Sequence, residues 1–393
     1  MNQYEKTNCN LCHSNGIVPF LTFDRMPLTG IYKHTRSYER PYFFDQTLCY
    51  CKVCSHFQLG QPIDEALLYQ ETYSHKTSGS RIATKGNDHF FDFISRLSRG
   101  KTFDLALEIG SNDGYLLNKI KSLSTRRIGV DPNIDAYQDD KELRIRSFIT
   151  PEFNYDLFDH PDLVISTSTF EHIVEIGSVL ENVVKVSRDG CMFFVEVPGF
   201  EEMSLNGRWD QVFHQHVNYF TKQSLGSAFE RLGCELVAFE TNHGYWGGNL
   251  LACFTKNSKK IDLSITSSMA NADLTGIDLS YKHFKEHLAL LSAKLLRLKS
   301  DIIYGFGAAQ MLPILAYHLQ TDFGLLNSIL DDDPNRKGLF YPYLVPPVEM
   351  PSYDFDWPAS TILITALDSS REISVRLSKS DAKRILLPLP LLN

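Results

Sequence analysis

The stretch Leu107–Leu117, LEIGSNDGYLL, decides the fold of this 393-residue chain. Apolar residues run up to Ile109, and two glycines, Gly110 and Gly114, follow at a spacing of four. A strand that runs into such a loop is typical of an open α/β sheet, because the glycines permit a tight turn and a close approach of the backbone to a ligand. The pattern lacks the third glycine of the dinucleotide fingerprint. It predicts a cofactor loop made by Glu108, Gly110, Ser111, Asn112, Asp113 and Gly114.

The segments around this loop predict two α/β units. Strands are expected at 104–109, 127–130, 163–166, 191–197 and 234–239, with helices at 179–187 and 223–232. Such an alternation favours a parallel sheet. A polar connector at 256–275 and an amphipathic helix at 281–299 lead to a second unit, with strands at 301–304, 328–330 and 361–366 and a helix at 311–319. The loop GFGAAQ at 305–310, taken alone, would suggest a second nucleotide site. The expected domains are 1–75, 76–255 and 256–393.

Two further features indicate which cofactor the first loop takes. Asp131 ends the next expected strand, about 20 residues after the loop, where an acidic side chain accepts hydrogen bonds from a ribose diol. Asp113, inside the loop, could face an ammonium group of the cofactor. The strand DLVIST at 162–167 is followed by FEHI at 170–173. Together with the loop, these features predict S-adenosylmethionine as the cofactor.

The cysteines predict a metal site near the N-terminus. Five of the eight cysteines lie before residue 55. Cys9 and Cys12 form one C-x-x-C pair, and Cys51 and Cys54 form another. Two such pairs can bring four thiolates to one tetrahedral zinc ion, and four cysteines leave no open position for chemistry. The sequence therefore predicts a structural zinc site, with Cys49, His13 and His56 as nearby alternative ligands.

Composition narrows the possible partners. The chain is 43% apolar and 22% charged, with a formal net charge of −8, as in an ordinary globular protein. This charge argues against a general nucleic-acid binder, which needs a basic face. No apolar run is long enough for a membrane span, and the N-terminus lacks the pattern of a signal peptide. We therefore expect no nucleic acid, no membrane and a cytoplasmic location, and either a monomer or a small homo-oligomer.

The ordered set of motifs resembles the C-methyltransferases that act at C3 of nucleotide-linked 4-keto-deoxyhexoses. The similarity covers the two C-x-x-C pairs, the segment 73–80, the motifs LEIGSNDGYLL, GVDP, FEHI and VEVPGF, then FHQHVNYFT and GGNL, and finally YGFGAAQ. The resemblance implies a small zinc-binding domain, a class I, Rossmann-like methyltransferase domain and a C-terminal Rossmann-like α/β domain that helps hold the nucleotide sugar without binding NAD. It also implies that Tyr73 and Ser80 close over S-adenosylmethionine.

The segment 213–220, FHQHVNYF, carries the expected catalytic chemistry. Histidine is a suitable base because it titrates near neutral pH. By the resemblance, His216 is the general base that removes the proton beside the 4-keto group, His214 is its companion and His172 lines the site. Phe213 stands where the family has tyrosine and Gln215 where it has glutamate, so a phenol and a negative charge are missing. The substrate-binding residues implied are Phe213, Gln215, Asn218, Tyr219, Gly247, Gly248 and Asn249.

Those two departures leave other functions open. One alternative is methyl transfer to an oxygen or nitrogen of a sugar or small metabolite on the same fold, which needs only a base near the acceptor. Another is a catalytically degenerate homologue that binds a nucleotide sugar.

Overall fold

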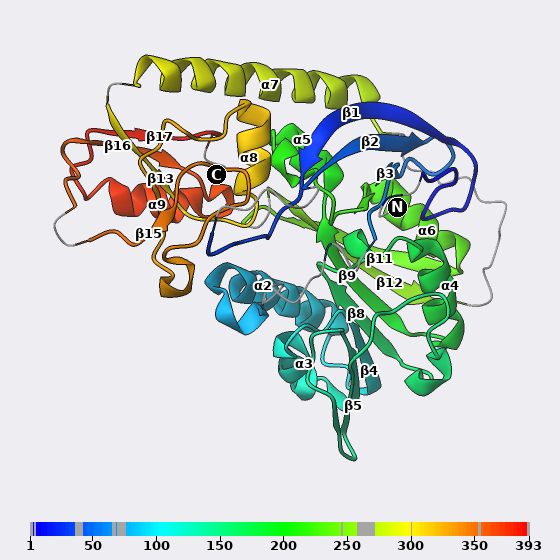
Figure 1. Cartoon of the computed structure of the whole chain (residues 1–393). Coiled ribbons are helices and arrows are strands. Elements are labelled where there is room, and N and C mark those ends of the chain that lie inside the picture. The colour runs from blue at the N-terminus through cyan, green and yellow to red at the C-terminus, as the bar shows by residue number, and fades with distance from the viewer. Residues whose placement is uncertain are drawn as a thin grey trace.

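The computed structural model describes residues 3, 5–35, 42–64, 68, 76–244, 247–257, 272–299, 301–352 and 355–390. Within these residues the strands form three sheets, and helices pack around them (Figure 1). The expected α/β class is confirmed. No helix of the described part has both the length and the apolar character needed to cross a membrane.

The central sheet has eight strands in the order β11-β12-β9-β8-β4-β5-β7-β6. Strands β7, β5, β4, β8 and β9 are parallel, whereas β12 is antiparallel to both of its neighbours. The chain passes from β4 to β5 on one side and later to β8 on the other, so the strand order reverses between β4 and β8. Ligands of open α/β sheets bind at such a switch point. The bounds are β4 Phe103–Ile109, β5 Ser124–Val130, β6 Tyr137–Gln138, β7 Glu142–Ile145, β8 Leu163–Thr167, β9 Met192–Pro198, β11 Cys234–Asn242 and β12 Asn249–Lys256.

Two helices of this unit were expected from the sequence, whereas its other helices and some of its strands were not. Helices α4 (Ile176–Val186) and α6 (Lys222–Arg231) lie where apolar spacing predicted them. Helix α2 (Arg81–Ser98) was not predicted, because polar residues interrupt its apolar face, yet Phe90, Phe93 and Ile94 are buried against the sheet. Strand β12 was also missed: it shows no alternation because both faces of the sheet are covered here, with Leu250, Ala252 and Phe254 in one apolar cluster and Leu251 and Cys253 in another. The remaining helices here are α3 Tyr115–Lys119 and α5 Phe200–Leu205.

The N-terminal sheet is antiparallel in the order β1-β2-β3-β10. Its strands are β1 Ile17–Pro27, β2 Phe43–Cys51, β3 Phe57–Leu59 and β10 Asn218–Tyr219. The long strands β1 and β2 are not among the elements that the sequence predicted. Strand β10 lies within the histidine segment 213–220, far beyond residue 75, so this sheet ties the metal-binding segment directly to the expected catalytic residues.

The C-terminal sheet is parallel in the order β15-β14-β13-β16-β17. The chain starts at its centre, so β13 and β16 form a second switch point. The expected helix at 281–299 is present but begins earlier, at Leu274, because Asp273 caps it by accepting from the Gly276 backbone N–H. The connector expected at 256–275 lies mostly outside the described residues. The bounds are α7 Leu274–Arg297, β13 Ile302–Phe306, α8 Leu312–Leu319, β14 Ile329–Leu330, β15 Val348–Glu349, β16 Ser360–Ile364, α9 Ser370–Leu377 and β17 Arg384–Leu386.

A buried ion pair joins the central and C-terminal units. The Arg208 guanidinium donates to both carboxylate oxygens of Asp210, at 2.8 and 2.9 Å, and to Asp368 Oδ1 at 2.7 Å. Arg208 and Asp210 are both buried. Asp368 belongs to the C-terminal unit, so one cation balances two carboxylates across the contact between the units.

Replacing Arg208 with methionine should therefore destabilise the protein strongly. The variant leaves Asp210 buried and unpaired, which costs about 3–5 kcal/mol. The midpoint of urea unfolding measures this loss. The matched control is Arg96→Met, because Arg96 makes an equally close bidentate pair with Glu240 at the surface. Water replaces that exposed pair, so the control should unfold close to wild type; equal losses in the two variants would contradict the expectation.

Candidate active site and metal centre

A cavity of about 580 Å³ opens at the switch point between β4 and β8. Its size lies in the usual range for a cofactor site. The lining combines the expected Glu108, Gly110, Ser111, Asn112 and Asp131 with residues that follow β8. These five residues of the loop and the next strand end are thus brought to one wall, as the sequence predicts.

The cofactor loop is held in shape by Asp131. One carboxylate oxygen accepts from the Asn112 backbone N–H at 3.0 Å, and the other accepts from the Asn133 N–H at 2.7 Å. Each oxygen keeps a second lone pair for a ligand hydroxyl. Burial raises the pKa of Asp131 and raises that of Glu108 well above its usual value. The Ser111 hydroxyl and Glu108 Oε2 are buried without a hydrogen-bond partner among the described residues. These polar atoms suit a polar ligand such as S-adenosylmethionine.

Other expected cofactor residues lie differently. Asp113 Oδ2 accepts from the Ser78 backbone N–H and hydroxyl, so its carboxylate turns toward the segment before α2. Ser80 caps α2 by accepting from Ala83 N–H and lines a different cavity. Gly114 caps α3. Tyr73 lies outside the described residues.

Several cavity residues were missed by the sequence. They come from α2, from the segment after β7 and from the turn after β8, and none carries a motif: Asn87, Arg146, Phe148, Ile149 and Thr169. They are recognised as cavity residues only from their positions in the folded structure. A search for polar or aromatic residues just beyond each parallel strand would have found three of them, Arg146, Phe148 and Thr169.

His172 and His216 meet at the edge of this cavity. Their ring centroids lie 5.0 Å apart, and His172 lines the cavity while His216 lies just behind it. The ligand atoms of Glu171, His172 and His216 lie within 4.8 Å of one another. His172 Nδ1 is 2.8 Å from the Gln215 carbonyl oxygen, which fixes its ring. Burial lowers the pKa of His172 to about 4 and that of His216 well below its usual value.

His214 does not join the other two histidines. Its Nδ1 lies 3.1 Å from Gln46 Nε2 and its Nε2 lies 2.9 Å from the Met26 carbonyl oxygen, both in the N-terminal sheet. Both ring nitrogens are thus occupied within the protein. The two histidines of the H-x-H pattern point in different directions, which differs from the shared catalytic site that the resemblance implied.

The two residues that depart from the family pattern pack closely around the site. The Phe213 ring lies 4.2 Å from the His216 ring. Gln215 Oε1 accepts from Thr29 Oγ1 at 3.4 Å and from Gln310 Nε2 at 3.1 Å. Gln215 therefore links the N-terminal sheet, the histidine segment and the C-terminal unit.

Most of the expected substrate residues have structural contacts instead. Asn218 donates to the carbonyls of Phe170 and Ile173, and the Tyr219 hydroxyl accepts from the Phe213 N–H. Asn249 is fully buried and donates to Glu196. The Gly248 carbonyl accepts from the Gly199 N–H, and Gly247 lines a separate cavity of about 380 Å³.

A larger cavity of about 1070 Å³ lies at the second switch point. Lys76, Ser80 and Ile82 form its wall toward the central unit, while Thr77 and Ala83 of the same segment line the cofactor cavity. This segment thus separates the two cavities. The opposite wall comes from the N-terminal and C-terminal units and includes Gly30, Tyr32, Gly307, Gln310, Asp331 and Arg336.

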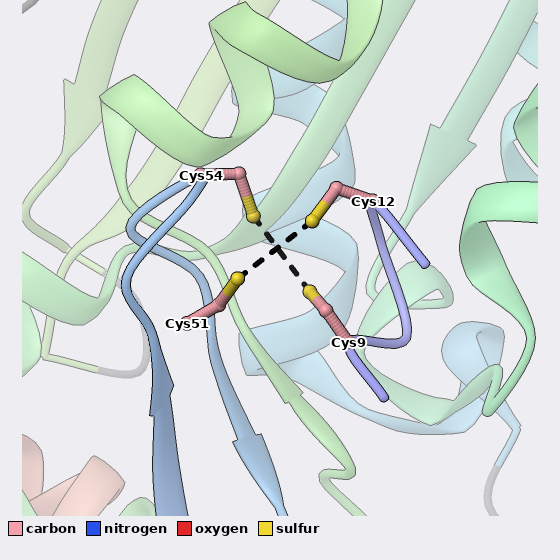
Figure 2. A group of neighbouring side chains, drawn as sticks. All are labelled: Cys9, Cys12, Cys51 and Cys54. Carbon is pink, nitrogen blue, oxygen red and sulfur yellow. Dashed lines mark hydrogen bonds between the residues drawn. The ribbon is translucent and has the colours of Figure 1, made fainter. Parts of the chain in front are cut away.

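The four expected metal ligands gather at one point. Figure 2 shows their side chains converging, with Cys9 and Cys54 sulfurs 3.7 Å apart and those of Cys12 and Cys51 also 3.7 Å apart. A tetrahedral zinc ion with bonds of about 2.3 Å places its sulfurs about 3.8 Å apart. Hydrogen bonding with Cys51 lowers the pKa of Cys12, and hydrogen bonding with Cys12 raises that of Cys54. The residues fit zinc, while Cys49, His13 and His56 lie outside the cluster.

Two protein families match this chain. Residues 83–238 match the family described as "Methyltransferase domain", and residues 9–69 match the one described as "Putative zinc binding domain". The chain carries a methyltransferase domain behind a zinc-binding domain. The expected combination is confirmed, and with it S-adenosylmethionine as the cofactor of the methyltransferase domain and zinc as that of the zinc-binding domain.

Individual relatives are similar over parts of the chain. C-methyltransferase NovU from Streptomyces niveus is 33% identical over 144 residues, which cover 35% of this chain and 34% of NovU. The match thus spans about a third of that relative. Among solved structures, N-methyltransferase NodS from Bradyrhizobium japonicum has a TM-score of 0.36 at 12% identity, covering 49% of this chain and 95% of NodS. The 1,6-didemethyltoxoflavin-N1-methyltransferase of Burkholderia thailandensis has a TM-score of 0.33 at 13% identity. The match covers 42% of this chain and 76% of that enzyme.

Proposed function

We propose that this protein transfers a methyl group from S-adenosylmethionine to a carbon of a nucleotide-linked keto-deoxysugar. The observation that carries the proposal is the pair of cavities on either side of the segment 76–83, with His172 and His216 beside the cofactor cavity. The similarity to a relative named as a C-methyltransferase supports carbon as the acceptor atom. The proposed domains are 1–75, 76–255 and 256–393, with β10 completing the first sheet.

In this proposal the larger cavity holds the nucleotide sugar. It lies beyond the carboxyl ends of parallel strands, where a nucleotide binds in other open sheets. Asp331 already accepts from the Ala308 N–H at 2.6 Å, and Arg336 donates to the Ala308 carbonyl at 2.8 Å, so the loop after β13 is rigidly held. Stoichiometric NAD binding here would contradict the assignment to a nucleotide sugar.

His216 acts as the base in the proposed reaction. It takes the proton from the carbon beside the ketone, and the C–H electron pair stays on the acceptor as an enolate. His172, whose ring lines the cofactor cavity, donates to or orients the enolate oxygen. Bound S-adenosylmethionine supplies an electrophilic methyl group on its sulfonium. The remaining contribution of the protein is to hold the two reactants in line.

Replacing His216 with asparagine should abolish deuterium exchange at the acceptor carbon, because the base is removed while a similar polar volume remains. A panel of nucleotide 4-keto-deoxysugars is incubated with the enzyme in D₂O, with and without the cofactor. Mass spectrometry then measures deuterium exchange and the gain of a methyl group in each sugar. General-base catalysis contributes about 10²–10⁴-fold, which sets the expected loss.

The control is His160→Asn, because His160 is exposed, distant in the sequence and at a positive φ that asparagine tolerates. Unchanged exchange in His216→Asn would place the base elsewhere. A label from methyl-labelled cofactor found on oxygen or nitrogen would favour the alternative reaction, and cofactor binding without any transfer would favour a degenerate homologue.

A further inference from the structure

A carboxyl group is buried beside the two histidines, His172 and His216. Glu171 lies in the short 3₁₀ turn Phe170–His172 and is 1% exposed. Its Oε2 has no hydrogen-bond partner among the described residues. A buried carboxylate oxygen without a partner is costly. One carboxylate oxygen of Glu171 lies within 4.8 Å of a ring nitrogen of His172 and of a ring nitrogen of His216, so both imidazoles are polar neighbours of the carboxyl group.

The backbone holds this arrangement firmly. The Val217 N–H donates to the Glu171 carbonyl at 2.8 Å, and Asn218 Nδ2 donates to the Phe170 carbonyl at 3.0 Å. Asn218 Oδ1 in turn accepts from Asn10 and His56 of the zinc-binding domain. These backbone and side-chain bonds between the two segments therefore hold Glu171 and His216 close to each other.

Several uncharged groups lie around His216. The groups facing it are His172, the Tyr219 ring at 6.4 Å between centroids, the Phe213 ring and the Gln211 carbonyl. Burial lowers the pKa of His216, and burial raises that of Glu171 to about 8. Either charge alone is unfavourable here, whereas a carboxylate beside an imidazolium is a neutral pair in which each group stabilises the other.

We propose that Glu171 is a positioning residue that supports His216 as the base, in place of the carboxylate that Gln215 does not supply. This proposal rests on the proposed function only in that His216 is taken as the base of the methyl-transfer reaction. When His216 takes a proton from the acceptor carbon, the electron pair of the broken C–H bond remains on the acceptor and the new imidazolium faces the Glu171 carboxylate. The same contact also fixes the orientation of the His216 ring before the reaction.

The test follows the His216 ring by NMR in the full-length, zinc-loaded protein. Histidine-selective ¹³C and ¹⁵N labelling, with the signal assigned by its loss in His216→Asn, gives both the pKa and the ring-nitrogen shifts. Glu171→Gln removes the charge at constant shape, so the pKa of His216 should fall by about one unit or more. If His216 stays neutral across the accessible range, its ¹⁵N shifts still report the lost contact. The control Glu201→Gln removes a half-buried carboxylate on α5 and should leave the ring unchanged.

The outcomes separate this proposal from the proposed function. Unchanged pKa and ¹⁵N shifts of His216 in Glu171→Gln overturn the support role, even if the wild type methylates a keto-sugar. A shifted ring in a protein that methylates no keto-sugar leaves the support role standing and removes the proposed function. Where turnover is found, Glu171→Gln should lower kcat at least 10-fold with little change in KM for the sugar; a change confined to KM counts against the proposal.

Discussion

Replacing Gly110 with alanine should abolish cofactor binding. Gly110 has φ of +77°, and a Cβ built there would lie 1.8 Å from Thr169 Oγ1 and 2.6 Å from Thr169 Cβ. The clash cannot be relieved locally, because the Thr169 hydroxyl is bound to the Thr167 carbonyl at 2.9 Å. The ends of β4 and β8 would be pushed apart at the switch point. We expect affinity for S-adenosylhomocysteine, measured by calorimetry, to fall at least about 100-fold, equivalent to about 2.7 kcal/mol.

The matched control is Gly190→Ala. Gly190 has φ of +78°, yet no atom lies within 4 Å of the Cβ position. Both variants carry the same backbone strain, about 1–2 kcal/mol for an L residue in this region, but only Gly110→Ala adds the clash. A double variant with Thr169→Gly should recover part of the affinity. Binding within threefold of wild type in Gly110→Ala would show that the loop is not the cofactor site.

Replacing Cys54 with serine should remove zinc and disorganise the zinc-binding domain. Structural zinc contributes about 10–16 kcal/mol of apparent binding free energy at pH 7, so the loss of one thiolate has a large effect. Elemental analysis after dialysis against a chelator should find one zinc per wild-type chain and almost none in the variant. Thermal unfolding should begin at a lower temperature.

Cys49→Ser is the control, since Cys49 is buried on the same strand as Cys51 but lies outside the cluster. It should keep its zinc. We also expect Cys54→Ser to reduce methyl transfer more than cofactor binding. Asn10, between the first two ligands, donates to Asn218 and so reaches the histidine segment, whereas the cofactor cavity is lined by residues 77–173. Full zinc content in Cys54→Ser would refute the four-cysteine site.

Much of the cofactor site could be predicted from the sequence because its signals are local. The strand, Gly110 and the loop are consecutive, and Asp131 stands at the end of the next strand, where the geometry of a parallel sheet requires it. The two C-x-x-C pairs could also be recognised from the sequence. Strand β12 and helix α2 were missed, because their burial patterns depend on neighbours elsewhere in the chain.

The arrangement of the expected catalytic residues could not be predicted from the sequence. The sequence pattern places His214 and His216 together, but His214 is turned into the N-terminal sheet by Gln46 and Met26. The partner of His216 is His172, from a different segment, and Glu171 comes with it. Two residues at this spacing share a face in an extended strand, but the chain turns here, with the His216 N–H donating to the Phe213 carbonyl, so the two rings point to different sides.

The sequence by itself determined that this protein has a glycine-containing cofactor loop, an acidic strand end and four paired cysteines, because each depends on short-range spacing and backbone geometry. Only the tertiary structure decided which ionisable groups face each other. The closeness of Glu171 to His216 depends on the register between two distant segments, fixed by Asn218 and the backbone of Val217. Burial in that contact then sets the charges of both groups, and burial is a property of the packed fold.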